Sequence, residues 1–225
     1  MGDGVKVNLK PETRPSAVAL ANEENPKNML KRLFDIIFSF LGLLILFPFL
    51  LIISFLIIIE SRGGIFYKQQ RVGRNDRDFS LIKFRSMREN SDKSGLLTIG
   101  AKDKRITKSG YYLRKYKLDE IPQLINILTG EMSFVGPRPE VRKYVELYDE
   151  HQRKVLKVKP GLTDYASIEY FKESEILFSK PNPENAYIKE IMPAKLDLNL
   201  KYIDEKSFFM DFRIIIKTIL KVFHL

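Results

Sequence analysis

The sequence predicts a helix-rich α/β fold with a membrane re-entrant helix–break–helix, a short β-hairpin and a C-terminal amphipathic helix. Three observations predict this fold: the apolar run Leu33–Ile59 with a proline inside it, two strand-like stretches joined by a polar turn, and helical periodicities that continue to the C-terminus. A chain of 225 residues is long enough to bury a core as one domain with an appendage.

The amino-acid composition limits the classes of partner that the protein is expected to bind. The formal net charge of +10 calls for an anionic partner: nucleic acid, an anionic membrane surface or phosphorylated small molecules. The chain has no cysteine, which excludes disulfides and thiolate metal sites and fits a reducing compartment, and its two histidines, His151 and His224, disfavour a zinc site. No helix-turn-helix, zinc-finger or single-strand-binding motif accompanies the charge, so we expect no nucleic-acid partner.

Residues 1–27 are polar, contain three prolines and show no apolar periodicity, so we expect a flexible lead-in. Residues 28–61 hold the apolar run, in which Asp35 is the single charge. As a straight helix this run would span about 40 Å, more than the ~30 Å hydrocarbon core of a bilayer. One transmembrane helix is therefore the simplest interpretation.

Two features favour a re-entrant hairpin instead. Pro48 lies near the middle of the run, where it removes a backbone hydrogen bond and bends or breaks a helix. Basic residues also flank both ends, and a single span cannot place both flanks on the cytoplasmic side. A helix–break–helix that enters and leaves through the same leaflet satisfies both features. The flanking basic residues are Lys27, Lys31 and Arg32 before the run, and Arg62, Lys68 and Arg71 after it.

Residues 62–225 are expected to form a cytosolic domain. After Gly63 and Gly64, residues 65–73 and 79–87 have the composition of two strands, with the polar turn 74–76 between them. Because strand side chains alternate, Lys83 and Arg85 are expected on the same side of the second strand.

Apolar residues at helical spacing predict helices over 106–116, 121–128 and 141–155. Gly130 is a C-terminal stop for the second of these, Asp119 is expected at its N-cap, and Pro122 is tolerated in its first turn. We expect residues 170–193 to be mostly irregular with one short helix, since they contain three prolines.

The tail, residues 208–223, has a helical pattern with one apolar face. A basic amphipathic helix of this kind can lie in a membrane interface, and packing against the core is an equally good interpretation of the pattern. The residues expected on this face are Phe208, Phe212, Ile215, Ile216, Ile219 and Phe223.

The adjacent acids Asp119 and Glu120 admit two interpretations. Acidic residues at the start of a helix commonly serve as caps. The same position is expected to keep a carboxylate ionised, and therefore available as a nucleophile or a magnesium ligand.

Arg138 is held between Pro137 and Pro139, which restrict its backbone and pre-orient a fork for phosphate oxygens. An arginine in a surface turn is the alternative. Lys83, Arg85 and Arg114 are candidates to complete a phosphate-binding cluster, although each alone is also typical of a solvated charge. The sequence has no Gly-rich phosphate loop and no Gly-x-Ser-x-Gly motif.

The order of these features resembles one family. A basic flank and a proline-containing apolar segment precede KFRSM, then LRKYKLDEIPQLINILTGEMSFVGPRP, then VKPGLT. This pattern, from about Asn28 to Val222, is similar to the bacterial sugar transferases, the monotopic phosphoglycosyl transferases that start glycan assembly on a polyprenol carrier.

The resemblance implies a reaction and roles. Such enzymes move a sugar-1-phosphate from a UDP-sugar to polyprenol (undecaprenyl) phosphate, release UMP and require Mg²⁺, on the cytoplasmic face of the bacterial inner membrane. It implies that Asp119 attacks the sugar-side phosphorus to form a covalent intermediate, and that Glu120 helps hold Mg²⁺ or positions the carrier phosphate. Phosphate-gripping roles would fall to Lys83, Arg114 and Arg138, and residues 62–225 would be the catalytic domain.

The sequence departs from the family pattern at three places. Phe47-Pro48 stands where many members have Ser-Pro, and residues 164–168 stand where many continue Gly-Leu-Ala-Gln-Val. Asn199, twelve residues before Asp211, stands where relatives often have an acid. The second departure leaves the sugar unidentified, and the third weakens any third catalytic acid at that position.

Two alternatives stay open. A non-catalytic membrane adaptor of a glycan-assembly pathway would retain the fold, although it has no need of all four residues Arg114, Asp119, Glu120 and Arg138. Direct displacement, with Asp119 only as a metal ligand, would give the same products. The sequence does not name the sugar or the glycan, and it leaves the oligomeric state open, a homo-oligomer included.

Overall fold

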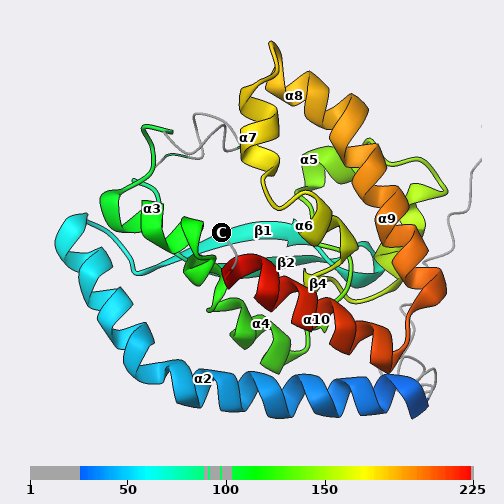
Figure 1. Ribbon diagram of the computed structural model, residues 1–225, viewed down its shortest axis with the longest axis horizontal. Coiled ribbons are helices and arrows are strands. Elements are labelled where there is room, and N and C mark those ends of the chain that lie inside the picture. The colour runs from blue at the N-terminus through cyan, green and yellow to red at the C-terminus, as the bar shows by residue number, and fades with distance from the viewer. Residues whose placement is uncertain (1–25, 89–90, 92–96, 98–102, 224–225) are drawn as a thin grey trace, which may run out of the picture.

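The computed structural model describes residues 26–88, 91, 97 and 103–223 (Figure 1). A long helix, α2, borders one side, the hairpin β1–β2 lies in the middle, and helices α5 to α9 gather on the other side, with α10 crossing in front (Figure 1). Most of the predicted lead-in, and most of the residues between 88 and 103, lie outside the described residues. The sequence-based expectation of a helix-rich α/β fold with a long apolar N-terminal helix is confirmed.

Helix α2 runs over Pro26–Glu60 and contains Pro48. It is one continuous helix, so the expected break between two arms is a bend, visible in Figure 1 where the ribbon changes direction. Proline has no N–H to donate to the preceding turn and its ring clashes with that turn, which explains the bend. By length and composition, Met29–Glu60 could cross a membrane.

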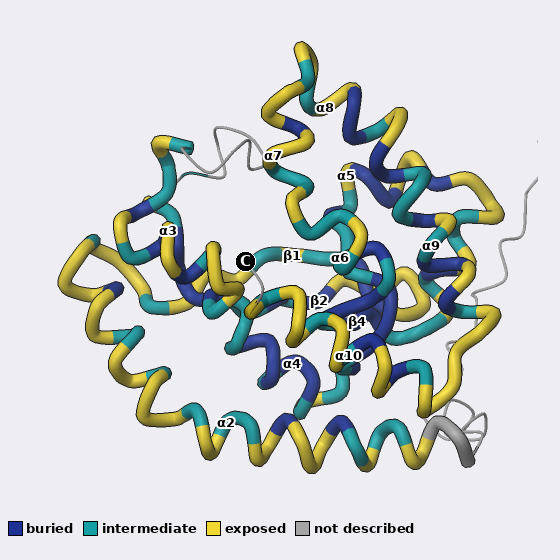
Figure 2. The backbone as a smooth tube through the Cα atoms, in the orientation of Figure 1, coloured by how far each residue is buried: buried dark blue, intermediate teal, exposed yellow. Residues whose placement is uncertain are grey.

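The outer side of α2 is largely exposed and apolar (Figure 2). Its inner side faces the rest of the protein through Asp35, Ser39 and Ile57, which are buried. Soluble monomers rarely expose so continuous an apolar surface, so this face suits contact with lipid. Exposed side chains include Leu33, Phe40, Leu44, Ile45, Phe47, Phe49, Ile52, Phe55 and Ile59.

The predicted hairpin is confirmed. Strand β1, Phe66–Val72, pairs antiparallel with β2, Asp78–Phe84, and Tyr67 lies opposite Lys83. The short turn η1, Arg74–Asp76, connects them with Asn75 at φ 58°, in the left-handed region that asparagine tolerates.

Two helices lie near their predicted positions. Helix α3, Lys108–Lys115, begins at Thr107, whose side chain accepts a hydrogen bond from the Gly110 N–H. Helix α4, Gln123–Thr129, ends at Gly130 with φ 93°, so the glycine stop is confirmed. The prediction that Asp119 caps this helix is wrong. Asp119 lies in a separate 3₁₀ turn, η3, Leu118–Glu120.

The sequence did not predict a short pair of parallel strands, β3 Ser133–Val135 and β4 Gly161–Thr163. Gly136 and Gly161 meet so closely that a Cβ on Gly161 would lie 2.1 Å from the Gly136 nitrogen. This contact has no room for a side chain, and it fixes the turn after β3 against β4.

The predicted helix over 141–155 is wrong as a single element. The structure has α5, Arg142–Val145, and a 3₁₀ helix η4, Gln152–Lys157. Asp149 and Gln152 explain the division: the Gln152 N–H donates to Asp149 Oδ1 at 2.8 Å, and the Asp149 N–H donates to Gln152 Oε1 at 3.1 Å. This reciprocal capping starts a new helical turn.

The expectation of a mostly irregular region over 170–193 is also wrong, because helices fill most of it. The prolines do not interrupt them: Pro183 and Pro193 occupy first-turn positions, where the missing N–H costs little. The elements after β4 are α6 Tyr165–Glu169, α7 Glu173–Phe178, α8 Pro183–Ala186, the π-helical turn η5 Tyr187–Ile191 and α9 Met192–Glu205.

Helix α10, Phe208–Phe223, has the predicted bounds. It buries Asp211 and Ile214, whereas most of the predicted apolar face is exposed. The core-packing interpretation of that face is therefore disfavoured, and the exposed face suits a membrane interface. The exposed members are Phe208, Phe212, Ile216, Ile219 and Phe223.

Candidate active site

The acid pair lies in the turn η3, between α3 and α4. Lys117 begins this turn in the left-handed conformation, with φ 56° and ψ 20°. The turn separates the two carboxylates: Glu120 is ion-paired, and Asp119 is buried, with one oxygen that has no hydrogen-bond partner in the part of the chain that the structure describes.

Glu120 is held by two cations from distant elements. Arg138 Nη1 donates to Glu120 Oε2 at 3.2 Å, and Arg138 Nη2 bonds Oε1. Lys83 Nζ of β2 lies 3.5 Å from Oε1. Burial alone would raise the pKa of Glu120, but the charges of Arg138 and Lys83 hold that pKa well below its usual value. Glu120 is therefore an anion that joins β2 to the Pro-Arg-Pro turn.

Asp119 is only 5% exposed, and its Oδ1 has no hydrogen-bond partner among the described residues. Burial, and then the neighbouring charge of Glu120, raise the pKa of Asp119, while Lys83 and Arg114 act in the opposite direction. Burial and the charge of Glu120 therefore oppose the ionised form of Asp119, contrary to the expectation that a helix N-terminus keeps this carboxylate ionised. A cation brought by a substrate would favour the charged, reactive form.

Lys83 projects from β2 beside Glu120 and Asp119. Burial lowers the pKa of Lys83 to about 8, although Glu120 acts to raise it. The side chain is thus close to losing its charge in mildly alkaline solution, and a bound anion would restore the charge.

The remaining predicted residues have different surroundings. Arg114 of α3 lines the cavity described below and acts electrostatically on Asp119. Arg85 is buried and donates to the carbonyl oxygens of Ser61 at 2.7 Å and Arg62 at 2.9 Å, so it holds the chain that follows α2. Pro48 lies in α2, exposed and away from the acid pair.

Arg138 is positioned by the loop that departs from the family pattern. Its backbone N–H donates to Asp164 Oδ2 at 3.1 Å, while Asp164 Oδ1 accepts from the Ser167 N–H at 2.6 Å and caps α6. The Arg138 guanidinium forms its fork with Glu120, whose charge raises the arginine pKa. The position of Arg138 is thus fixed from both sides of the turn.

A cavity of about 1120 Å³ contains these groups. Cations and carboxylates line one part of it, and apolar side chains of α2, α4, β3, β4 and α10 line another. This combination suits a substrate with both a phosphate and a hydrocarbon portion. The polar part includes Lys83, Arg114, Asp119, Glu120 and Arg138, and the apolar part includes Leu46, Leu124, Phe134, Leu162, Ile215 and Ile219.

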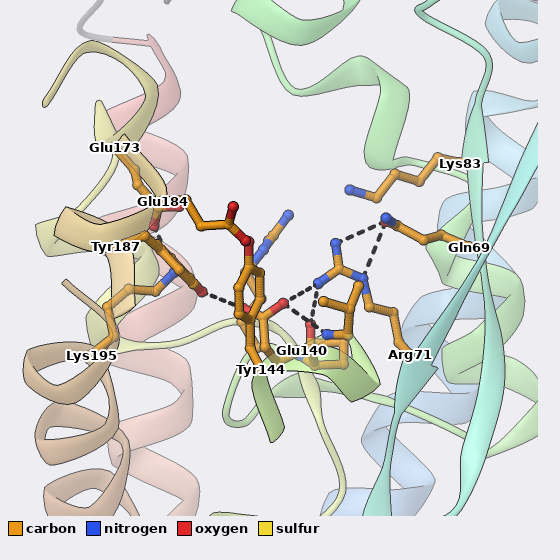
Figure 3. A network of polar contacts seen from close by, with 12 residues as sticks. Gln69, Arg71, Lys83, Glu140, Tyr144, Glu173, Glu184, Tyr187 and Lys195 are labelled. Carbon is orange, nitrogen blue, oxygen red and sulfur yellow. Dashed lines mark hydrogen bonds and ion pairs between the residues drawn. The ribbon is translucent and has the colours of Figure 1, made fainter. Parts of the chain in front are cut away.

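A polar network that the sequence did not predict forms another wall (Figure 3). Arg71 Nη1 of β1 donates to Glu140 Oε1 at 2.8 Å and to the Pro139 carbonyl at 3.1 Å, and the Tyr187 hydroxyl bonds Glu140 Oε2. Gln69 Oε1 accepts from Arg71 Nη2 at 2.8 Å. Glu140 therefore ties β1 to η5, and its place directly after Pro139 is the one sequence signal that could have found it.

Three further polar atoms of residues that line the same cavity have no hydrogen-bond partner among the described residues. They are Arg85 Nε, Ser167 Oγ of α6 and Asn199 Oδ1 of α9, and Asn199 is only 5% exposed. Ser167 and Asn199 lie at positions where the sequence departs from the pattern expected of the family.

The donor set can be tested against a magnesium ion. Among the described residues, no three or more His, Cys, Asp or Glu side chains lie together so that they could hold a metal ion by themselves. Mg²⁺ commonly uses one or two carboxylates and takes its other ligands from water and substrate phosphates. Asp119 has an oxygen without a partner, whereas both Glu120 oxygens are bonded to cations. The residues fit an ion that shares its coordination with a diphosphate, with Asp119 as the readier ligand.

Comparison with known proteins gives relatives of one kind. The chain is 36% identical over 194 residues to the uncharacterized sugar transferase EpsL of Bacillus subtilis, covering 86% of this chain and 87% of that one. It is 35% identical over 199 residues, 87% of its length, to the UDP-glucose:undecaprenyl-phosphate glucose-1-phosphate transferase of Escherichia coli. It is 32% identical over 195 residues, 84% of its length, to the UDP-N-acetylgalactosamine-undecaprenyl-phosphate N-acetylgalactosaminephosphotransferase of Aeromonas hydrophila.

The matched region spans 40% of the Escherichia coli protein and 43% of the Aeromonas protein. The family model for the bacterial sugar transferases matches residues 26–225, which include the acid pair, the Pro-Arg-Pro turn and the apolar helix. The chain belongs to the bacterial sugar transferase family.

Proposed function

We propose that this chain transfers a sugar-1-phosphate from a UDP-sugar to polyprenol phosphate, releasing UMP, as the first membrane step of a bacterial glycan pathway. One observation carries the proposal: a single cavity brings together a buried Asp119 oxygen that has no hydrogen-bond partner among the described residues, cations that include Lys83, Arg114 and Arg138, and apolar side chains that include residues of α2 and α10. The names of the Escherichia coli and Aeromonas relatives agree with this reaction.

The reaction has two steps on one carboxylate. An Asp119 oxygen attacks the sugar-side phosphorus, and the bond between that phosphorus and the bridging oxygen breaks with its electron pair leaving on UMP. A phosphate oxygen of the polyprenol carrier then attacks the same phosphorus and expels Asp119. Displacement at phosphorus depends on positioning and charge neutralisation, which Lys83, Arg114 and Arg138 can supply. Mg²⁺, held by Asp119 and substrate oxygens with Glu120 nearby, would neutralise charge on the diphosphate.

Direct displacement by the carrier phosphate is the second mechanism, with Asp119 only as a metal ligand. A buried carboxylate oxygen without a partner is costly unless it is used, and both mechanisms use the Asp119 oxygen that has no partner among the described residues, as the nucleophile in one and as a metal ligand in the other. In a non-catalytic adaptor, no function would compensate for leaving this buried oxygen without a partner.

The activity is tested by product identity. The full chain in detergent, incubated with Mg²⁺, undecaprenyl phosphate and a panel of UDP-sugars, is expected to release UMP with at least one sugar. Omission of undecaprenyl phosphate is the control, and it should reduce release to at most one UMP per enzyme. Release of UDP in place of UMP would overturn the proposal, since the sugar would then move without its phosphate.

The proposed location is the bacterial inner membrane, with the active site on the cytoplasmic face and α2 entering and leaving through one leaflet. The bend at Pro48, the exposed apolar face and the basic flanks support this topology. Because the chain has no native cysteine, single cysteines at Met29 and Arg62 can be labelled cleanly. We expect an impermeant maleimide to react with both cysteines from the cytoplasmic side. Reaction of the two cysteines from opposite sides of the membrane would refute the re-entrant path of α2.

A further inference from the structure

Three charged residues near the N-terminal end of α2, Lys31, Arg32 and Asp35, contact the rest of the protein and are here called the collar. A charge inside an apolar helix is expensive, and Asp35, which is 2% exposed, is the single charge within Leu33–Ile59. Each member of the collar bonds a backbone group of the segment 127–135. The collar therefore calls for an explanation beyond membrane attachment.

Lys31 joins four elements through its ammonium group. Its Nζ donates to the Val135 carbonyl of β3 at 2.7 Å and to the Tyr202 hydroxyl of α9 at 2.9 Å, and it lies 2.7 Å from Asp211 Oδ2 of α10. The Tyr202 hydroxyl donates to Asp211 Oδ1 at 2.6 Å. With three partners, this lysine has used its whole donor capacity.

Arg32 and Asp35 fix the same segment at two more places. Arg32 Nη1 and Nη2 donate to the carbonyls of Ile127 at 2.6 Å and Leu128 at 2.8 Å, which are among the last carbonyls of α4. Asp35 Oδ1 accepts from Ser133 Oγ and from the Phe134 N–H, both at 3.1 Å.

The clamped segment connects the two halves of the active site. Its N-terminal end is α4, which follows directly after Asp119 and Glu120, and its C-terminal end is β3, which leads into the turn with Arg138. A shift of α4 against β3 would move Glu120 relative to Arg138. Misplacement of a reacting group by about 1 Å can cost about 10²-fold in rate.

We infer that the collar positions Glu120 and Arg138, and thereby couples the seating of α2 in the membrane to the chemistry. Lys31 is a positioning residue, since it acts through Val135 and touches no reacting atom. Buried ion pairs are weak stabilisers compared with apolar packing, which argues against stability as the sole reason for these charges. For its kinetic test the inference rests on the proposed function.

The test uses Lys31→Met in the full chain, with Lys31→Arg as the conservative variant and the exposed Lys68→Met as the matched control. We expect Lys31→Met to lower kcat for UMP release by about 10-fold to 10²-fold. Lys31→Arg should recover most of kcat, and Lys68→Met should behave as the parent protein.

A second readout does not depend on activity. The Arg138 N–H, which donates to Asp164, and the Gly136 N–H, which donates to the Thr163 carbonyl, should exchange with solvent faster in Lys31→Met, while amides of β1–β2 keep their rates. If Lys31→Met does not fold, Lys31→Gln takes its place, since an amide still donates to Val135.

A lower melting temperature with unchanged kcat and unchanged amide exchange would overturn the inference and leave the collar as an anchor. Failure of the parent protein to release UMP would count against the proposed function alone. Exchange at Gly136 and Arg138 would then decide the collar.

Discussion

Asp119→Asn is expected to abolish both turnover and the covalent phosphosugar adduct. The amide oxygen is a neutral and poor nucleophile, and loss of a nucleophile that works within a catalytic unit costs about 10⁴-fold or more in kcat. The fold should persist, because Asp119 Oδ1 has no hydrogen-bond partner among the described residues and the neutral amide suits a site where burial disfavours a charge. The melting temperature is therefore expected to stay the same or rise.

The measurement is intact-protein mass after incubation with a UDP-sugar and Mg²⁺ but without polyprenol phosphate. The parent protein should gain the mass of one sugar phosphate, and Asp119→Asn should gain none. Asp197→Asn, at an exposed position of α9, is the matched control and should gain the same mass as the parent. An unchanged parent mass under conditions that support turnover would contradict the covalent route and leave direct displacement.

Lys83→Met is expected to lower kcat/KM about 10²-fold to 10³-fold, the range for loss of one preorganised group that stabilises developing charge. The parent protein should also show an alkaline limb. Burial lowers the pKa of Lys83 to about 8, so below pH 8 the free enzyme holds the cation, and above it each pH unit removes about nine-tenths of what remains. Because the proposed role of the cation is to bind phosphate, we expect kcat/KM to fall about tenfold per unit above pH 8.

Lys83→Arg keeps the positive charge at position 83 but removes the titration near pH 8. Arginine stays protonated throughout this range, so the alkaline limb should move beyond pH 10 even if the rate is reduced. Profiles of kcat/KM from pH 6 to pH 10 for the parent, Lys83→Arg and Lys83→Met check both points. An alkaline limb near pH 8 that persists in Lys83→Arg would assign the titration to another group.

Local patterns were sufficient for elements that neighbouring residues specify. The hairpin β1–β2, the glycine stop after α4 and the bounds of α10 depend on turn chemistry and periodicity within about fifteen residues, and all three were predicted. Two of the misses were also local in origin. Asp149 and Gln152 cap a new turn and divide one predicted helix, and Pro193 lies in the first turn of α9, directly after η5, without ending a helix.

At the candidate site, the sequence likewise predicted which residues are present but not which of them lie in contact. The sequence placed Asp119, Glu120 and Arg138 in one block without any distances between them. It could not separate Lys83 from Arg85, because strand alternation puts both on the same side of the predicted strand. The fold brings Lys83 to Glu120 and uses Arg85 to hold the chain after α2. The strand β2 ends at Phe84, so alternation no longer governs Arg85.

The sequence by itself determined the class of protein: an apolar helix with an internal proline, an acid pair and a constrained arginine in a fixed order. The tertiary structure alone decided the state of these groups. Asp119 is buried beside a charged neighbour, Glu120 is bonded to Arg138 and Lys83, and the collar of α2 clamps the segment between them. The physical reason is that burial and charge pairing arise between residues far apart in the chain, and pKa depends on both.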